Sequence, residues 1–161
     1  MKKLKIYLDT SIISHLDALD TEAKMRETLE LWESIKADKY EIVMSDLVFE
    51  EISKCYLPKR DKLTDFLRDI DYVLVKNSKE IETIAKKIVQ IGILTATNYN
   101  DALHIAFAIF NKCDILVSWN FKHMVNDKTE KGIIYLACLL NIQDIQIISP
   151  TKLLQIIKEE K

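Results

Sequence analysis

Short apolar segments that alternate with longer amphipathic ones constrain the fold more than any other feature of this sequence. Lys3–Leu8, Glu41–Met44 and Asp114–Ser118 have the length and apolar content of buried strands, and apolar residues at helical spacing follow each of them. Neither Asn-Gly nor Asp-Gly, the pairs that signal a tight β-hairpin, occurs in the chain. Strands joined through helices pair in parallel. The pattern therefore predicts an α/β fold, a three-layer α/β/α sandwich with a central parallel sheet.

The other elements follow from the same periodicities and from helix caps. Two more strands are expected at Tyr72–Val75 and Ile145–Ile148. Asp20, Ser45 and Ser78 are predicted N-caps, because their short polar side chains accept hydrogen bonds from the first backbone N–H groups of a helix. Helices are expected from Ser11 towards Leu19, over Asp20–Ala37, Ser45–Cys55, Pro58–Ile70, Ser78–Gly92, Asp101–Lys112 and Lys128–Leu140, and from Pro150 onward.

Size and composition indicate one globular domain over residues 1–161. Apolar residues make up 48% and charged residues 30% of the 161, which is typical of a folded soluble protein. The net charge of −2 argues against a protein that coats nucleic acid through its overall charge. Binding of nucleic acid at a local basic rim stays open.

The cysteines and the hydropathy pattern favour a reducing cytoplasm. Cys55, Cys113 and Cys138 are odd in number and lack the spacing of a zinc site, so we expect small buried apolar side chains. The chain has no secretory signal and no apolar run of about 18 residues, the length that a membrane span needs.

Carboxylates lie at the ends or on the buried faces of the predicted elements. Asp9 follows the first strand, Asp101 opens a strongly apolar helix, and Glu51 shares a helix face with Leu47 and Cys55. Burial of a carboxylate is costly without a positive partner, and most of these acids have no Lys or Arg beside them. A divalent metal would supply that charge, and ligands of parallel sheets bind beyond the carboxyl ends of the strands. The sequence thus favours a metal-dependent hydrolase.

Each acid also has an ordinary structural role open to it. Asp9 can cap the helix that follows it, and Asp101 can complete a capping box with Asn98. Glu50 points to the other side of its helix from Glu51, so we expect Glu50 to be a solvated surface acid.

Other polar residues near these acids are harder to interpret. His104 is expected to be packed or to support a metal ligand rather than to bind metal itself. Ser118 and Asn120 follow a strand in an arrangement that ordinary turns also use, and Trp119 between them is expected in the core. His123 shows no convincing partner in the sequence.

Four segments, in order and spread over nearly the whole chain, resemble the motifs of the PIN domain. Within that family the chain looks like the VapC-like toxins of bacterial toxin–antitoxin pairs. The segments are Ile6-Tyr7-Leu8-Asp9-Thr10-Ser11, Ser45 with Glu51 six residues later, Asn100-Asp101-Ala102-Leu103-His104-Ile105-Ala106, and Val117-Ser118-Trp119-Asn120-Phe121-Lys122-His123.

The resemblance implies a carboxylate cluster that binds Mg²⁺ or Mn²⁺ and cleaves single-stranded RNA. The first three acids of the family fall on Asp9, Glu51 and Asp101, which become the expected catalytic residues and metal ligands. The fourth position, usually an Asp, falls on Asn120. An amide oxygen can ligate a metal but brings no charge, so the second metal position is weakened.

The resemblance also implies partners and supporting residues. A small antitoxin protein is the expected partner of a VapC-like toxin, and a homodimer is the implied assembly. Thr10 and Ser118 are expected to support the acids. Lys122 and the Lys59–Lys62 cluster are candidate contacts of the RNA backbone, with a solvated surface role favoured for the cluster.

Two alternatives to a ribonuclease remain. Asn120 and the negative net charge favour a catalytically weak PIN domain that acts as an RNA-binding or protein-interaction module. A structure-specific DNA nuclease on the same fold is the other.

Overall fold

A five-stranded parallel sheet forms the centre of the protein, whose computed structural model describes residues 2–161. The strands lie in the order β3-β2-β1-β4-β5, and each neighbouring pair is parallel. Because the order reverses at β1, the carboxyl end of β1 lies at the switch point where ligands of such sheets bind. The strands are β1 (Leu4–Leu8), β2 (Tyr40–Ser45), β3 (Val73–Val75), β4 (Ile115–Val117) and β5 (Gln146–Ile148).

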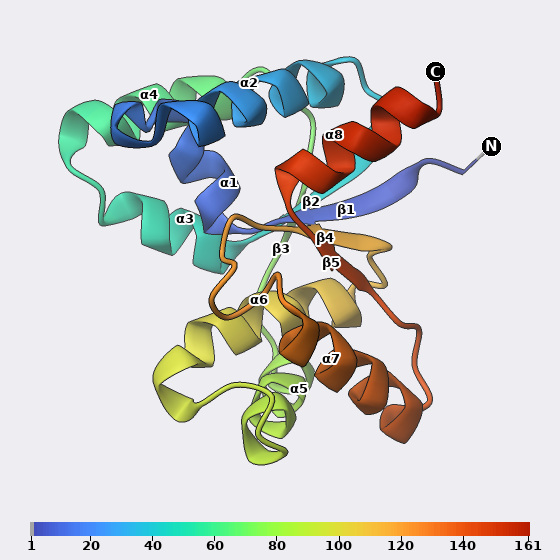
Figure 1. Cartoon of the computed structure of the whole chain (residues 1–161). Helices are drawn as coiled ribbons and strands as arrows, with labels where there is room; N and C mark the ends of the chain where they lie inside the picture. Colours follow the sequence, from blue (N-terminus) through green and yellow to red (C-terminus); the bar gives the residue numbers. More distant parts are fainter. Residues whose placement is uncertain (1) are drawn as a thin grey trace.

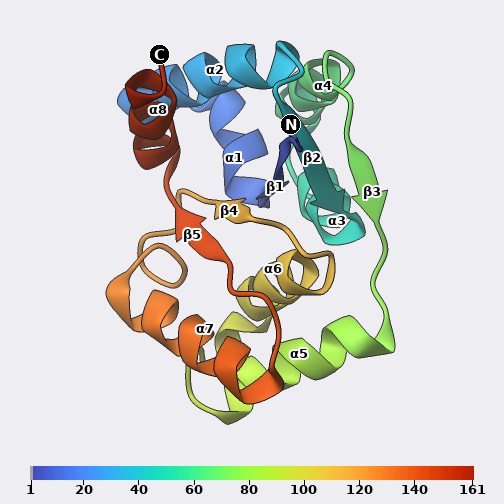
Figure 2. The ribbon, with the colours of Figure 1, turned by 90° about the vertical axis from the view of Figure 1, so that its right-hand side faces the viewer.

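Helices cover both faces of the sheet, which gives the three layers seen in Figure 1 and, from the side, in Figure 2. One layer contains α1 (Thr10–Ser14), α2 (Glu22–Lys36), α4 (Leu57–Leu67) and α8 (Pro150–Glu159), and the other contains α5 (Lys79–Gln90), α6 (Tyr99–Phe110) and α7 (Asp127–Leu140). Helix α3 (Asp46–Ser53) contributes to the cores of both layers. Short 3₁₀ turns occur at η1 (His15–Asp17), η2 (Leu19–Thr21) and η3 (Ala96–Asn98).

The alternation of side chains along β1 builds a core on each face of the sheet. Ile6 and Leu8 are buried with apolar residues of α1, α2 and α8, whereas Tyr7 between them is buried with residues of α5, α6 and α7. Successive strand side chains point to opposite faces, and both faces are covered, so β1 is apolar along almost its whole length. The predicted three-layer sandwich is therefore confirmed.

Local differences from the sequence predictions have simple causes. The stretch after Ser11 is a short helix followed by two 3₁₀ turns rather than one helix to Leu19. Thr21, not Asp20, is at the N-cap position of α2. Asn98 is at the N-cap position of α6, but its side chain makes no capping hydrogen bond, and its amide donates to Thr95 Oγ1 at 2.9 Å.

The cysteine prediction is wrong for one residue of three. Cys113 is buried and Cys55 partly so, but Cys138 is exposed on α7. All three are free. Within residues 2–161, no helix combines the length and the apolar character needed to cross a membrane.

Candidate active site at the carboxyl edge of the sheet

Buried polar residues stand where the strands end. Asp9 follows β1, Ser45 is the last residue of β2, Ser118 follows β4 and Ser149 follows β5, and all four are buried. The carboxyl ends of parallel strands meet at one edge, so these residues share the same side of the molecule. That edge is at the left of Figure 1, where α1 and α3 begin and where the loop between β4 and α7 lies.

Asp9 is the most buried carboxylate of this edge, with 4% of its surface exposed. Ser11 Oγ donates to its Oδ1 and Ser118 Oγ donates to its Oδ2, each at 2.6 Å. Burial raises the pKa of Asp9, although His104 and the two hydroxyl donors act in the opposite direction. The ion pairs within residues 2–161 do not include Asp9. Both oxygens of its carboxylate are thus held by neutral hydroxyl donors.

Glu51 ends a chain of buried hydrogen bonds that reaches back to the second strand. Its Oε1 lies 2.6 Å from His104 Nε2 and accepts a hydrogen bond from Thr10 Oγ1 at 2.8 Å. His104 Nδ1 lies 2.7 Å from the Tyr7 hydroxyl, which lies 2.7 Å from Ser45 Oγ. The chain therefore ties α1, α3 and α6 to the carboxyl edge of β1 and β2.

A neutral imidazole satisfies every member of this chain. Burial raises the pKa of Tyr7 well above its ordinary value, so its hydroxyl keeps its proton. Tyr7 can then donate to His104 Nδ1, while the Nε2 proton of His104 goes to Glu51. Burial raises the pKa of Glu51, but the hydrogen bonds from His104 and Thr10 act in the opposite direction, and the net pKa is lowered. Glu51 is held ionised.

The two neighbouring glutamates separate as the helix periodicity predicts. Glu51 is partly buried, whereas Glu50 is exposed and lies 4.0 Å from Lys54 in a surface pair. His104 is also as predicted, since it is 3% exposed and supports an acid.

Asp101 has a partner that the sequence did not reveal. It stands in the first turn of α6, and its Oδ2 lies 3.2 Å from His123 Nδ1. The sequence offered no convincing partner for His123, and the structure supplies one in Asp101. The two residues are 22 positions apart, and only the path of the loop after β4 brings them together.

Hydrogen bonds of Asn120 stabilise the loop after β4. Its backbone N–H donates to Ser118 Oγ at 2.9 Å, and its Oδ1 accepts the backbone N–H of His123 at 3.0 Å. Its carbonyl accepts from Met124 and Val125. These contacts match the turn role that the sequence left open, and the amide oxygen considered as a metal ligand holds the turn that places His123.

The other expected residues fall into two groups. Thr10 and Ser118 support acids directly, as described above. Lys122 is exposed in the loop after β4, whereas Lys62 of α4 pairs with Asp17 of η1 at 3.8 Å and Arg60 of α4 donates to Ser53 O of α3 at 3.1 Å. Lys62 is exposed, whereas Lys59 and Arg60 are partly buried. The surface role of the cluster stays a prediction.

Tyr7 and Ser11 are the supporting residues that sequence reasoning missed. The available signal for Tyr7 was its place between Ile6 and Leu8 in a buried strand, where its hydroxyl needs a buried partner. Ser11 donates to Asp9 and also accepts the backbone N–H of Trp119 at 2.9 Å. Its position two residues after Asp9 was the only hint.

Asp9, Glu51 and Asp101 lie at the same edge of the sheet, but their carboxylates do not surround a common point. Within residues 2–161, no three His, Cys, Asp or Glu side chains are gathered closely enough to hold a metal ion as they are placed. One oxygen of Glu51 is hydrogen-bonded to His104, and one oxygen of Asp101 lies 3.2 Å from His123 Nδ1.

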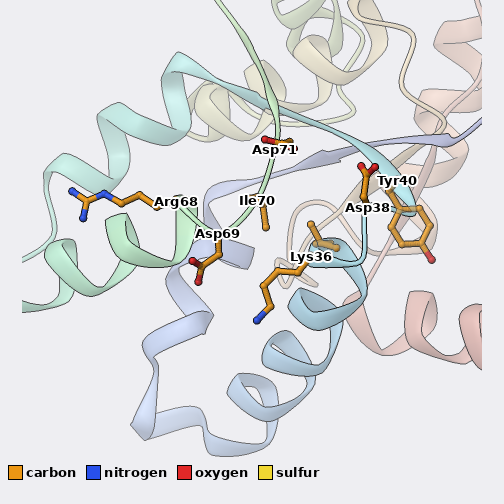
Figure 3. Close-up of a pocket in the computed structure, with 8 residues that line it drawn as sticks. Lys36, Asp38, Tyr40, Arg68, Asp69, Ile70 and Asp71 are labelled. Atoms are coloured by element: carbon orange, nitrogen blue, oxygen red, sulfur yellow. The ribbon is translucent and has the colours of Figure 1, made fainter.

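A separate hollow of about 100 Å³ lies at the opposite edge, near the amino ends of β2 and β3 (Figure 3). Its lining mixes acidic and basic side chains and contains none of the acids described above; it consists of Ile35, Lys36, Asp38, Tyr40, Arg68, Asp69, Ile70 and Asp71.

The sequence profile of the PIN domain matches residues 6–121, from β1 through the loop that follows β4. This match covers most of the chain and includes Asp9, Glu51 and Asp101. The chain belongs to the PIN domain family.

Solved structures of VapC proteins share the fold. VapC20 of Mycobacterium tuberculosis, described as a toxin that cleaves the sarcin–ricin loop, superposes with a TM-score of 0.57 at 17% identity, over 73% of this chain and 92% of that one. VapBC2 of Rickettsia felis, bound to a DNA fragment from its promoter, has a TM-score of 0.56 at 19% identity, over 91% and 98%. No curated protein sequence matches this chain significantly.

Proposed function

We propose that the protein is a metal-dependent endoribonuclease that cleaves single-stranded RNA, and that it acts as the toxin of a VapC-like toxin–antitoxin pair. The observation that carries the proposal is Asp9, a buried carboxylate at the switch point of a PIN-type sheet that forms no ion pair with a side chain of residues 2–161. Glu51 and Asp101 reach the same edge from α3 and α6.

The donor chemistry suits Mg²⁺ or Mn²⁺. Oxygen ligands select these hard cations, whereas zinc would favour His or Cys. In this proposal Asp9 and Asp101 bind the ion, and Glu51 binds it or orients the attacking water. A bound ion would polarise the phosphate and lower the pKa of water. Asn120, as an uncharged fourth residue, adds little to the hold on the ion.

The surrounding side chains prepare the acids for this task. Ser11 and Ser118 fix both oxygens of Asp9 without neutralising it. His104 and Thr10 hold Glu51 through Oε1 and keep it ionised, so it can accept a proton or orient water at neutral pH. Pre-positioned groups of this kind lower the reorganisation needed during reaction.

A small antitoxin is the proposed protein partner, supported by the fold shared with the R. felis VapBC2 complex. A homodimer is proposed on the same resemblance. We place the protein in the cytoplasm, and its free cysteines fit a reducing compartment.

Cleavage assays with the full chain test the proposal. Single-stranded RNA, duplex DNA and a DNA flap are incubated with Mg²⁺, with Mn²⁺ and with EDTA. We expect cleavage of single-stranded RNA alone, its loss in EDTA, and its loss in Asp9→Asn and Asp101→Asn. Preferential cutting of the flap would instead identify a DNA nuclease.

A catalytically weak PIN module is the second candidate, favoured by the amide oxygen of Asn120 that holds a turn. It predicts RNA binding without cleavage in either metal. The same assay, with a binding measurement added, separates it from the ribonuclease.

A further inference from the structure

Two aromatic rings and a lysine gather beside the candidate active site and are not needed to hold its acids. Phe121 lies in the loop between β4 and α7 with 47% of its surface exposed, next to Trp119, which is 6% exposed. Their ring centroids are 6.2 Å apart. Lys24 of α2 places its Nζ 5.6 Å from each ring centroid.

Trp119 anchors this group to the core. Its indole Nε1 donates to Thr28 Oγ1 at 2.8 Å, and its backbone N–H donates to Ser11 Oγ at 2.9 Å. The backbone N–H of Phe121 in turn donates to the Trp119 carbonyl at 3.0 Å. Phe121 is thus presented to solvent from a fixed backbone rather than left on a loose segment.

Lys24, the cation beside the rings, has no acidic partner among residues 2–161. The ion pairs within residues 2–161 include neither Lys24 nor the exposed Lys122 that follows Phe121. An exposed ring next to unpaired ammonium groups matches the two parts of a nucleotide, because the ring stacks on the base and the ammonium attracts the phosphate.

The group is also close to the acids. Ser118, which donates to Asp9, is three residues before Phe121. Three residues span at most about 11 Å between Cα atoms, which equals about three stacked nucleotides at roughly 3.4 Å each. Once the lengths of the side chains are added, a base on Phe121 would lie a few nucleotides from the bond at the acids.

We propose that Phe121 and Lys24 form a stacking site for one unpaired base of the RNA substrate, a few nucleotides from the cleaved bond. The proposal rests on the ribonuclease function proposed above. A base inside a duplex has both faces covered by its neighbours, so this site selects single-stranded RNA. Trp119 positions the platform without itself meeting the base.

The test measures binding of a short fluorescent single-stranded RNA by the full-length Asp9→Asn protein, which does not cut it. In that background Phe121→Ala should weaken binding about tenfold, the usual loss for one stacked base. Phe121→Trp should keep the affinity. Phe110→Ala is the matched control, since Phe110 is 45% exposed but lies at the far end of α6.

An RNA with one base removed gives the decisive comparison. Removing the base at the stacking position should abolish the difference between Phe121→Ala and its parent, whereas removal elsewhere should preserve it. A purely structural role for Phe121 predicts equal weakening for every RNA and overturns the proposal. Lys24→Met should lower the slope of affinity against salt by about one, and Lys39→Met, at the opposite edge, should leave it unchanged.

The two proposals fail differently. If the parent protein binds RNA and the unmodified protein cleaves it, but Phe121→Ala binds as tightly as its parent, the stacking site is wrong and the ribonuclease stands. If the unmodified protein neither binds nor cleaves single-stranded RNA, both are wrong.

Discussion

Substitution of His104 tests the hydrogen-bond chain that holds Glu51. The side chain is 3% exposed and joins two buried groups, the Tyr7 hydroxyl at 2.7 Å and the Glu51 carboxylate at 2.6 Å. A hydrogen bond between neutral groups contributes about 1 kcal/mol to stability, and one to an ionised group about 2 kcal/mol. His104→Ala loses both, so we expect about 3 kcal/mol of destabilisation before the added cost of the cavity.

Two conservative variants separate the contributions of the two hydrogen bonds. The amide nitrogen of Gln occupies the place of Nε2, so His104→Gln keeps the donor to Glu51 and should lose about 1 kcal/mol with the Tyr7 bond. Asn places its amide near Nδ1, so His104→Asn keeps Tyr7 as a partner and should lose about 2 kcal/mol with the Glu51 bond. In a Glu51→Gln background the loss for His104→Asn should fall to about 1 kcal/mol, because its partner is then neutral.

Urea unfolding at neutral pH, followed by circular dichroism, measures these differences. Ser53→Ala serves as a control, since the Ser53 hydroxyl only bonds to Glu50 O on the exposed side of α3. A loss of stability below about 1 kcal/mol for His104→Ala, or equal losses for His104→Gln and His104→Asn, would show that these hydrogen bonds do not hold Glu51.

The remaining predictions concern the acids and the turn. Asp9→Asn should stabilise the metal-free protein by about 1 kcal/mol at neutral pH, because it removes a buried charge. Thermal unfolding in the presence of EDTA measures this difference. A less stable Asp9→Asn variant would show that the charge of Asp9 is well compensated. Because the pKa of Asp9 is raised, the folded protein binds this proton more tightly than the unfolded chain, and the resulting stabilisation is present at acidic pH and lost as pH rises through the folded-state pKa. The stability gained by Asp9→Asn should therefore shrink in acid. A gain that does not depend on pH would contradict this. The lowered pKa of Glu51 has the opposite effect: ionised Glu51 stabilises the folded protein above its unfolded-state pKa, and this stabilisation is lost as pH falls through the folded-state pKa. The unfolding curves of Glu51→Gln and of the parent protein should therefore converge in acid. Glu51→Gln should greatly reduce RNA cleavage and Glu50→Gln should not, and equal loss would mean that the helix face is misassigned. Asn120→Asp should tighten Mn²⁺ binding in calorimetry, and Asn120→Ala should reduce RNA cleavage less than Asp9→Asn does. An unchanged affinity of Asn120→Asp for Mn²⁺ would mean that Asn120 is a turn residue alone.

The layer architecture and the strand ends were accessible from the sequence because they depend on local patterns. Apolar runs without hairpin turns require parallel pairing, and parallel pairing brings the end of each strand to one edge. Asp9 and Ser118 were placed at this edge for that reason. Helical periodicity likewise separated Glu51 from Glu50, since neighbouring residues on a helix point in different directions.

The partners of the acids were decided by tertiary structure. The sequence could place His104 one turn after Asp101, but only the packing of α6 against β1 and α3 joins it to Tyr7 and Glu51. His123 reaches Asp101 because Asn120 closes the loop after β4. Local patterns follow from bonded geometry and burial, whereas contacts between distant segments depend on how those segments pack, which no local pattern records.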